Sequence, residues 1–147
     1  MKNLKLLGLL LCTLLLTNFA LAQSETSNGT KPTDLSPAYV ALASHKSAVA
    51  SELKNLLADY TATSPNVLSK QFELEITQRE IAKVLVMPES RKSLLSDSYG
   101  KLLVRKITTE AALRNLLNEY TLSTPQVRGK SNELLAIENE LSEILLK

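Results

Sequence analysis

One phrase occurs twice in this chain, and its recurrence constrains the fold more than any other feature of the sequence. The stretch LLADYTATSPNV at residues 56–67 returns as LLNEYTLSTPQV at residues 116–127. A shift of sixty residues pairs residues 35–87 with residues 95–147 without a gap, and eighteen of the 53 pairs are identical. Such self-similarity is typical of a duplicated supersecondary unit. We therefore expect two structural repeats, at residues 35–87 and 95–147.

Hydrophobic periodicity indicates that each repeat is helical. Apolar residues are spaced alternately by four and three positions, with lysine at some of the same positions, and strand-like alternation is not visible. This spacing is typical of helices that supercoil against a partner. In the first helix of each repeat the expected seam is Leu35, Tyr39, Leu42, Lys46, Val49, Leu53, Leu56 and Tyr60, with Leu95, Tyr99, Leu102, Lys106, Thr109, Leu113, Leu116 and Tyr120 in the second copy.

The repeated phrase predicts a turn between two helices. Ser64 precedes Pro65, and Thr124 precedes Pro125 in the second copy. A hydroxyl residue suits the N-cap, and proline suits the first helical position because its missing N–H is not needed there. Proline also biases the preceding residue away from the helical region, so the incoming helix must end earlier. Each repeat is therefore expected to be an antiparallel αα-hairpin.

Together these patterns predict an all-α fold of two tandem αα-hairpins. The residues between the repeats, 87–93, form a short link that suits antiparallel neighbours. An up-down-up-down four-helix bundle with coiled-coil-like packing is the arrangement that this pattern favours. Two hairpins end to end, or a dimer of hairpins, are the alternatives.

The N-terminus has the pattern of a secretory signal peptide. Lys2 and Lys5 precede a leucine-rich run, and small residues lead up to Ala22. We predict cleavage after Ala22, a signal peptide at residues 1–22 and a disordered polar leader at residues 23–34. The alternatives are an uncleaved membrane anchor and a lipoprotein acylated on Cys12. Export to the periplasm or beyond follows from the first interpretation, with no membrane span after cleavage.

Removing the signal peptide changes the charge balance. Without Lys2 and Lys5, 15 of the 17 basic residues remain against 15 acidic ones. A neutral chain has no electrostatic footprint for nucleic acid or an anionic membrane surface. Cys12, the only cysteine, also leaves with the signal peptide, so neither a disulfide nor thiol chemistry is expected.

The sequence offers no pattern typical of an active site. His45 is the only histidine, and its counterpart Arg105 suggests a solvated helix position. Metal or acid–base sites need clustered ligands, and no Glu-x-x-His motif accompanies the carboxylates. We therefore expect no catalytic, cofactor-binding or metal-binding residues, and we interpret the following carboxylates as the solvated faces of helices: Glu73, Glu75, Glu80, Glu133, Glu138 and Glu140.

Repeated polar and aromatic residues remain as candidates for recognition. Tyr60 and Tyr120 end the apolar seams, where we expect them to pack the hairpin ends; an exposed tyrosine anchor for a partner is the alternative. A polar residue on a helical seam commonly sets the register or the choice of partner. The candidate specificity residues are therefore Lys46, Lys70, Lys106 and Lys130.

The turn also resembles a segment of a known family. In each copy a Tyr-Thr pair is followed by Ser-Pro or Thr-Pro and then valine, as at Tyr60, Thr61, Pro65 and Val67. This pattern is similar to the periplasmic helical hairpin of bacterial polysaccharide chain-length determinants and related exopolysaccharide export proteins. The family's usual histidine is replaced by Ser64 and Thr124, and its flanking membrane helices have no counterpart after the signal. The resemblance implies a hairpin and an address in the bacterial envelope.

These observations lead to an expected function of the binding class. We expect a small exported, non-enzymatic helical protein that acts by protein–protein interaction, as a scaffold or adaptor in the bacterial envelope, with a protein partner or self-association. The alternative is a periplasmic carrier or chaperone-like bundle that binds apolar ligands or unfolded chains.

Overall fold

The chain is helical over almost all of residues 35–146, the part that the computed structural model describes. The helices are α2 (Pro37–Asp59), α3 (Pro65–Leu85), a single turn α4 (Glu89–Lys92), α5 (Asp97–Glu119) and α6 (Pro125–Leu145). The bounds of α5 and α6 are those of α2 and α3 moved by sixty residues. The predicted signal peptide, the cleavage after Ala22 and the polar leader lie outside the described residues.

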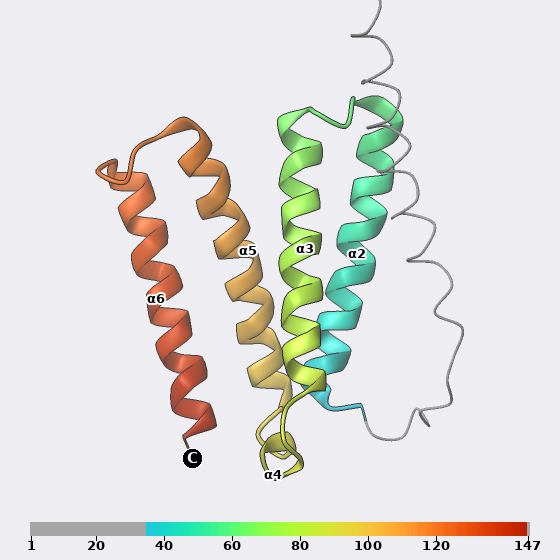
Figure 1. Ribbon diagram of the computed structural model, residues 1–147, viewed down its shortest axis with the longest axis vertical. Helices are drawn as coiled ribbons and strands as arrows, with labels where there is room; N and C mark the ends of the chain where they lie inside the picture. The colour runs from blue at the N-terminus through green and yellow to red at the C-terminus, as the bar shows by residue number, and fades with distance from the viewer. Residues whose placement is uncertain (1–34, 147) are drawn as a thin grey trace, which may run out of the picture. The chain divides into compact units, whose positions relative to one another are not determined.

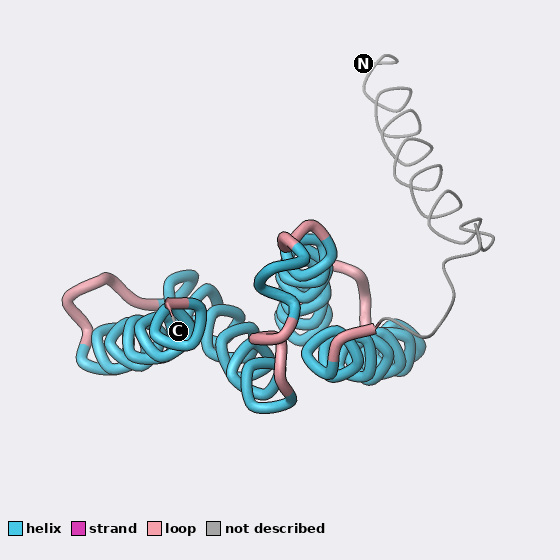
Figure 2. The backbone as a smooth tube through the Cα atoms, turned by 90° about the horizontal axis from the view of Figure 1, so that it is seen from below, coloured by secondary structure: helices cyan, strands magenta, loops and turns pink. Residues whose placement is uncertain are grey.

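The four long helices form two antiparallel hairpins that pack side by side. Figure 1 shows α2 and α5 running in one direction and α3 and α6 in the other. The prediction of an all-α bundle of two tandem hairpins is confirmed. Seen along the helices, α6, α5 and α2 lie in one row and α3 lies above it, over α5 and α2 (Figure 2). Helix α5 packs against α2, α3 and α6, whereas α6 packs mainly on α5.

Local sequence explains where each helix begins. The backbone N–H of Tyr39 donates to Ser36 Oγ at 3.2 Å, and that of Tyr99 donates to Ser96 Oγ at the same distance. Ser64 caps α3 in the same way by accepting from the N–H of Val67 at 3.4 Å. These bonds satisfy N–H groups that have no partner inside the helix.

Thr124 departs from the predicted capping role. It occupies the N-cap position of α6 before Pro125, but its side chain accepts no capping hydrogen bond. Its hydroxyl instead lies 3.5 Å from that of Thr121 in the loop. The proline and the extended backbone of the N-cap therefore start this helix without the hydroxyl.

The two turns share one backbone design. The N–H of Tyr60 donates to the carbonyl of Leu56 at 2.8 Å, and the N–H of Ser64 donates to Thr61 at 3.0 Å. The same two bonds, with the same lengths, form sixty residues later. Tyr60 and Tyr120 have the same extended conformation, which ends the incoming helix.

The main core lies where α5 meets its neighbours. It contains Leu42 from α2, Ile76 from α3, Ile137 from α6 and Ile107 from α5, all almost fully buried. In α5 the predicted seam positions Tyr99 and Thr109 are buried, but Leu103 and Ile107 are buried in place of the predicted positions 102 and 106. The shift arises because α5 contacts helices on several sides and must bury a wider stripe than a single seam.

Helices α2 and α5 approach each other closely near their N-termini. A Cβ at Gly100 would lie 2.8 Å from Ala38 Cα and 2.9 Å from Ala41 Cβ, so only glycine fits there. The N–H of Ala38 also donates to the carbonyl of Leu95 at 3.2 Å. The hairpins are therefore joined by a direct backbone contact and by the link through α4.

We predict that Gly100→Ala destabilises the protein by about 1–3 kcal/mol, because the added methyl group pushes against the backbone of α2. Gly129→Ala is the matched control, since a Cβ at Gly129 meets nothing within 4 Å. In this exposed helical position alanine should stabilise by about 0.5–1 kcal/mol. Urea unfolding followed by circular dichroism measures both effects, and a stabilising Gly100→Ala would show that the close contact is absent.

Candidate functional site

A cluster of charged side chains joins α2 to α3. His45 Nε2 lies 3.2 Å from Glu73 Oε1, and Lys70 Nζ lies 2.8 Å from Glu73 Oε2 and 2.6 Å from Glu52 Oε2. Glu73 is buried, and the side chain of His45 is only 15% exposed. The prediction that His45 is solvated was therefore wrong, as was the assignment of Glu73 to a solvated face.

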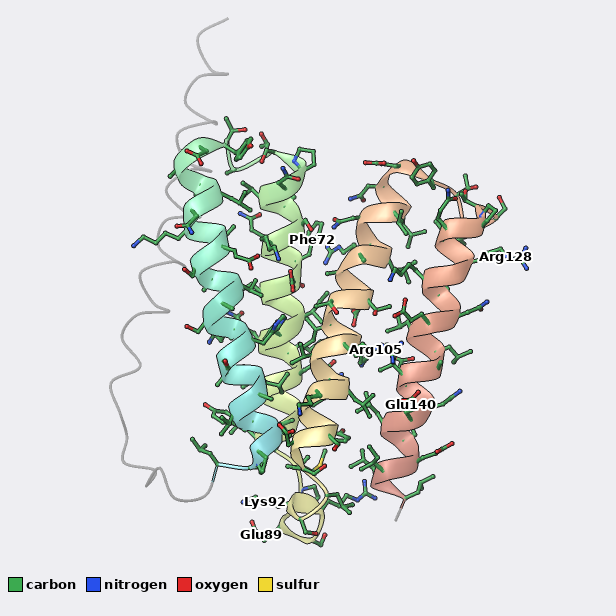
Figure 3. The ribbon with its side chains drawn as sticks, turned by 180° about the vertical axis from the view of Figure 1, so that it is seen from behind. Phe72, Glu89, Lys92, Arg105, Arg128 and Glu140 are labelled. Atoms are coloured by element: carbon green, nitrogen blue, oxygen red, sulfur yellow. The ribbon has the colours of Figure 1, made fainter. Side chains whose placement is uncertain are left out.

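An equivalent but more exposed cluster joins α5 to α6. Arg105 replaces His45 and lies 3.4 Å from Glu133, which Lys130 approaches at 2.8 Å. Arg105 extends from α5 (Figure 3), and its side chain is 55% exposed. Ala112 stands where Glu52 stands in the first hairpin, so the second cluster lacks the second carboxylate. The two hairpins therefore share a polar contact of the same design with different charges.

A second group of charges lies between α3, α5 and α6. Glu80 is only 3% exposed, and its Oε1 lies 2.9 Å from Lys83 Nζ and 3.2 Å from Lys106 Nζ. Lys106 also lies 3.5 Å from Glu138 on α6. Its side chain is 13% exposed and links three helices. The expectation that Glu80 belongs to a solvated face was wrong, because α5 covers this side of α3.

Further polar contacts hold α5 against α3. Arg79 Nη2 donates to both carboxylate oxygens of Glu110 at 2.7 Å. Arg114 lies 3.4 Å from Glu75 and stacks on the ring of Phe72 at 3.6 Å from its centroid. A guanidinium nitrogen that reaches both carboxylate oxygens and a stacked guanidinium each need a defined geometry, so they favour one register of the two helices.

The two buried carboxylates are held in their charged forms. The imidazole of His45, whose Nε2 lies 3.2 Å from the carboxylate, is the main reason that the pKa of Glu73 lies below its ordinary value of 4.5, and Lys70 adds to the effect. Burial alone would raise the pKa of Glu80. The hydrogen bond from Lys83 and the charge of Lys106 together outweigh burial, so this pKa is also lowered. Both carboxylates are therefore structural anions with cationic partners.

Helices α3 and α6 are parted, and a groove runs between them over α5. It has a volume of about 410 Å³. Its apolar part is formed by Val84 of α3, Met87 in the link after α3, Leu103 and Tyr99 of α5, and Leu141 and Leu145 of α6. Glu80, Lys83, Lys106, Glu138 and Ser142 line the rest. The groove exists because α6 packs mainly on α5 and does not close against α3.

A second groove lies between α2 and α3, near the first turn. Its volume is about 430 Å³, and all of its lining residues except Leu56 are polar or charged: Glu52, Asn55, Asn66, Ser69 and Lys70. Two of these residues, Glu52 and Lys70, already pair with each other. The groove over α5 instead has apolar side chains from three helices in its lining, and we take it as the candidate binding site.

The four lysines predicted as specificity residues differ in burial and in ion pairing. Lys70, Lys106 and Lys130 are half-buried and form ion pairs. Lys46 is exposed and pairs with none of the residues within 35–146, because His45 takes the inward position between Leu42 and Val49. Lys106, the counterpart of Lys46 in the second repeat, is the lysine that contacts Glu80.

The two tyrosines of the turns do not pack the hairpin ends as expected. Tyr60 is 50% exposed and Tyr120 is 45% exposed. Each lies at a helix C-cap in extended conformation, so it no longer follows the helical periodicity of the seam. The neighbouring Leu57 and Leu117 are both 43% exposed.

The described residues contain no group of three or more His, Cys, Asp or Glu side chains that could hold a metal ion. None of the helices in this part of the chain is long and apolar enough to cross a membrane. Searches with this chain found no matching family model, no matching curated protein and no matching solved structure.

We predict that Lys106→Met lowers the free energy of unfolding by on the order of 3 kcal/mol, because it removes one partner of a buried ion pair. The matched control is Lys46→Met, the position sixty residues earlier, which is exposed. An exposed position of this kind should change stability by no more than about 0.5 kcal/mol. Chemical denaturation of both variants measures the difference, and equal losses would contradict the ion-pair geometry.

We also predict that stability falls on acidification through protonation of Glu73 and Glu80. Since the pKa of each carboxyl is lower in the folded state, its contribution is present above the ordinary value of 4.5 and is lost as the pH falls through the folded value. The variant Glu73→Gln should have a shallower acid decline in urea unfolding than the unchanged protein. Glu140→Gln, which alters an exposed carboxylate, is the control and should leave the slope unchanged.

Proposed function

We propose that this protein is an exported, non-enzymatic scaffold or adaptor of the bacterial envelope that works by binding other polypeptides through the groove between α3 and α6. The observation that carries the proposal is the groove itself, whose apolar part is continuous with the core. An open apolar channel on a helical bundle suits a helix or an extended segment of another chain.

The surface around the groove supports a polypeptide as the occupant. Charged side chains of both signs line it: Lys83 on α3 and Glu138 on α6, which are 55% and 47% exposed. An apolar centre with a polar, charged border is the usual composition of a protein–protein interface. The signal-like N-terminus and the resemblance of the two turns to envelope hairpins support the proposed location.

A carrier for apolar ligands is the second candidate, and the size of the groove favours it. A volume of about 410 Å³ falls within the range of small-molecule sites. Two charged pairs beside the apolar lining are less suited to a lipid chain than to an amphipathic helix. Tight binding of a fatty acid to the purified protein, reduced by Ser142→Trp, would favour the carrier over the adaptor.

A photo-crosslinking amino acid placed at Ser142 tests the adaptor directly. Ser142 is exposed and lines the groove, and its counterpart sixty residues earlier, Ala82, is an exposed position on α3 that does not line it. We expect irradiated cells to give a discrete protein adduct from position 142 and none from position 82. Mass spectrometry then identifies the attached chain. Equal or absent adducts at the two positions would contradict the proposal.

A further inference from the structure

Helix α6 carries more apolar surface than its single main neighbour covers. Its buried residues, Val127, Ile137 and Leu141, belong to the stripe that packs on α5. Beside this stripe, Leu145 lines the groove, and Leu135 and Leu146 are 58% and 84% exposed. At the helical rotation of about 100° per residue, Leu145 adjoins the stripe, and Leu135 and Leu146 lie together farther around the same side, beyond Glu138 and Ser142. Nothing within residues 35–146 covers that side.

The charges of α6 are separated along its length. The N-terminal half contains Arg128, Lys130 and Glu133, and Lys130 pairs with Glu133 at 2.8 Å, whereas the C-terminal half contains Glu138, Glu140 and Glu143, with no basic residue in the last turn. The helix dipole disfavours acidic residues at a C-terminus. An antiparallel neighbour would offset this, because it would place Arg128 of a second helix beside the acidic half.

A second copy of α6 provides this neighbour. In an antiparallel pair related by a two-fold axis, Arg128 of each helix meets the acidic half of the other, and the complementarity is satisfied twice. An axis near Leu135 sets this leucine against its own copy. It also sets Arg128 opposite Ser142 of the second copy, one helical turn from Glu138 of the second copy.

Arg128 is placed for such a contact. It points outward from α6, away from α5 (Figure 3), and forms no ion pair within the described range. In the same arrangement the N-terminal end of one α6 lies over the groove of the other, near Glu138 and Leu145. Leu122, which precedes α6 and is 72% exposed, reaches the region of Leu146 of the second copy.

We propose that the protein forms a two-fold homodimer through antiparallel pairing of α6 with α6 of a second copy. The pairing buries Leu135 and Leu146 and extends each groove with the N-terminal half of the opposite helix. This inference rests on the proposed function, since it names a partner for the same surface. It also accounts for the exposed leucines and the separated charges of one helix with a single contact.

Sedimentation velocity of the purified, exported chain tests the dimer. We expect twice the mass of one chain at micromolar concentrations, and a monomer for Leu135→Glu. The matched control is Leu85→Glu on α3, because Leu85 has the same 58% exposure as Leu135 but lies away from α6. This control should remain a dimer. A monomeric unchanged protein, or an equal response of the two variants, would overturn the proposal.

A charge-reversal cycle tests the register. Arg128→Glu should weaken the dimer on the order of tenfold, because it places like charges near Glu138 of the second copy. Ser142→Arg should weaken it as well, because it faces Arg128 of the second copy. The double variant creates a Glu–Arg pair twice and should restore the affinity. Additive losses in the double variant would exclude this register.

The outcomes separate the dimer from the broader function. A crosslink from position 142 to a second copy of this chain supports both proposals. A crosslink to a different envelope protein, with a monomeric purified chain, overturns the dimer and leaves the adaptor function standing. The absence of any adduct together with a monomer overturns both.

Discussion

Helix α5 packs against three other helices, and its contact with α2 requires a glycine. Gly100 lets the backbones of α2 and α5 meet at Ala38, in a space that a methyl group would fill. From that contact α5 continues between α3 and α6, and it contributes Tyr99, Leu103, Ile107 and Ala111 to the core. The second hairpin is therefore attached to the first through one helix, and α6 depends on α5 for most of its packing.

Buried charges set how the helices align along this contact. Glu80 is buried with Lys83 and Lys106, and removing either partner would leave a carboxylate poorly compensated away from water. A buried ion pair adds little net stability compared with an apolar pair, so its main effect here is on register. Only one register of α3, α5 and α6 brings Glu80, Lys106 and Glu138 together while Arg79 reaches Glu110. The candidate groove lies beside this network, so its shape depends on the same alignment.

The helices, turns and antiparallel order could be predicted from the repeat, because proline, hydroxyl caps and apolar spacing act locally. The contacts between the repeats could not, since they depend on differences between equivalent positions. Gly100 corresponds to Val40, and buried Ile107 corresponds to exposed Ser47. Seam spacing placed Lys46 inward with Leu42 and Val49, and those two residues are buried, but His45 rather than Lys46 turns toward Glu73 between them. The burial of Glu73 and Glu80 was missed because a carboxylate on a helix face carries no local signal of the cation that will cover it.

The groove and the uncovered side of α6 exist because α6 lies at the edge of the helical array. Helix α3 is covered by α2 and α5, whereas α6 has one main neighbour and keeps exposed leucines. The proposed adaptor function and the proposed dimer both use this uncovered side of α6.

The central claim is that α5 organises the molecule, and native-state hydrogen exchange tests it most directly. The account predicts that the slowest-exchanging amides lie in the middle of α5, around Leu103–Ala111, and that α6 exchanges faster than α5. Equal protection of α5 and α6, or the slowest exchange in α6, would contradict it.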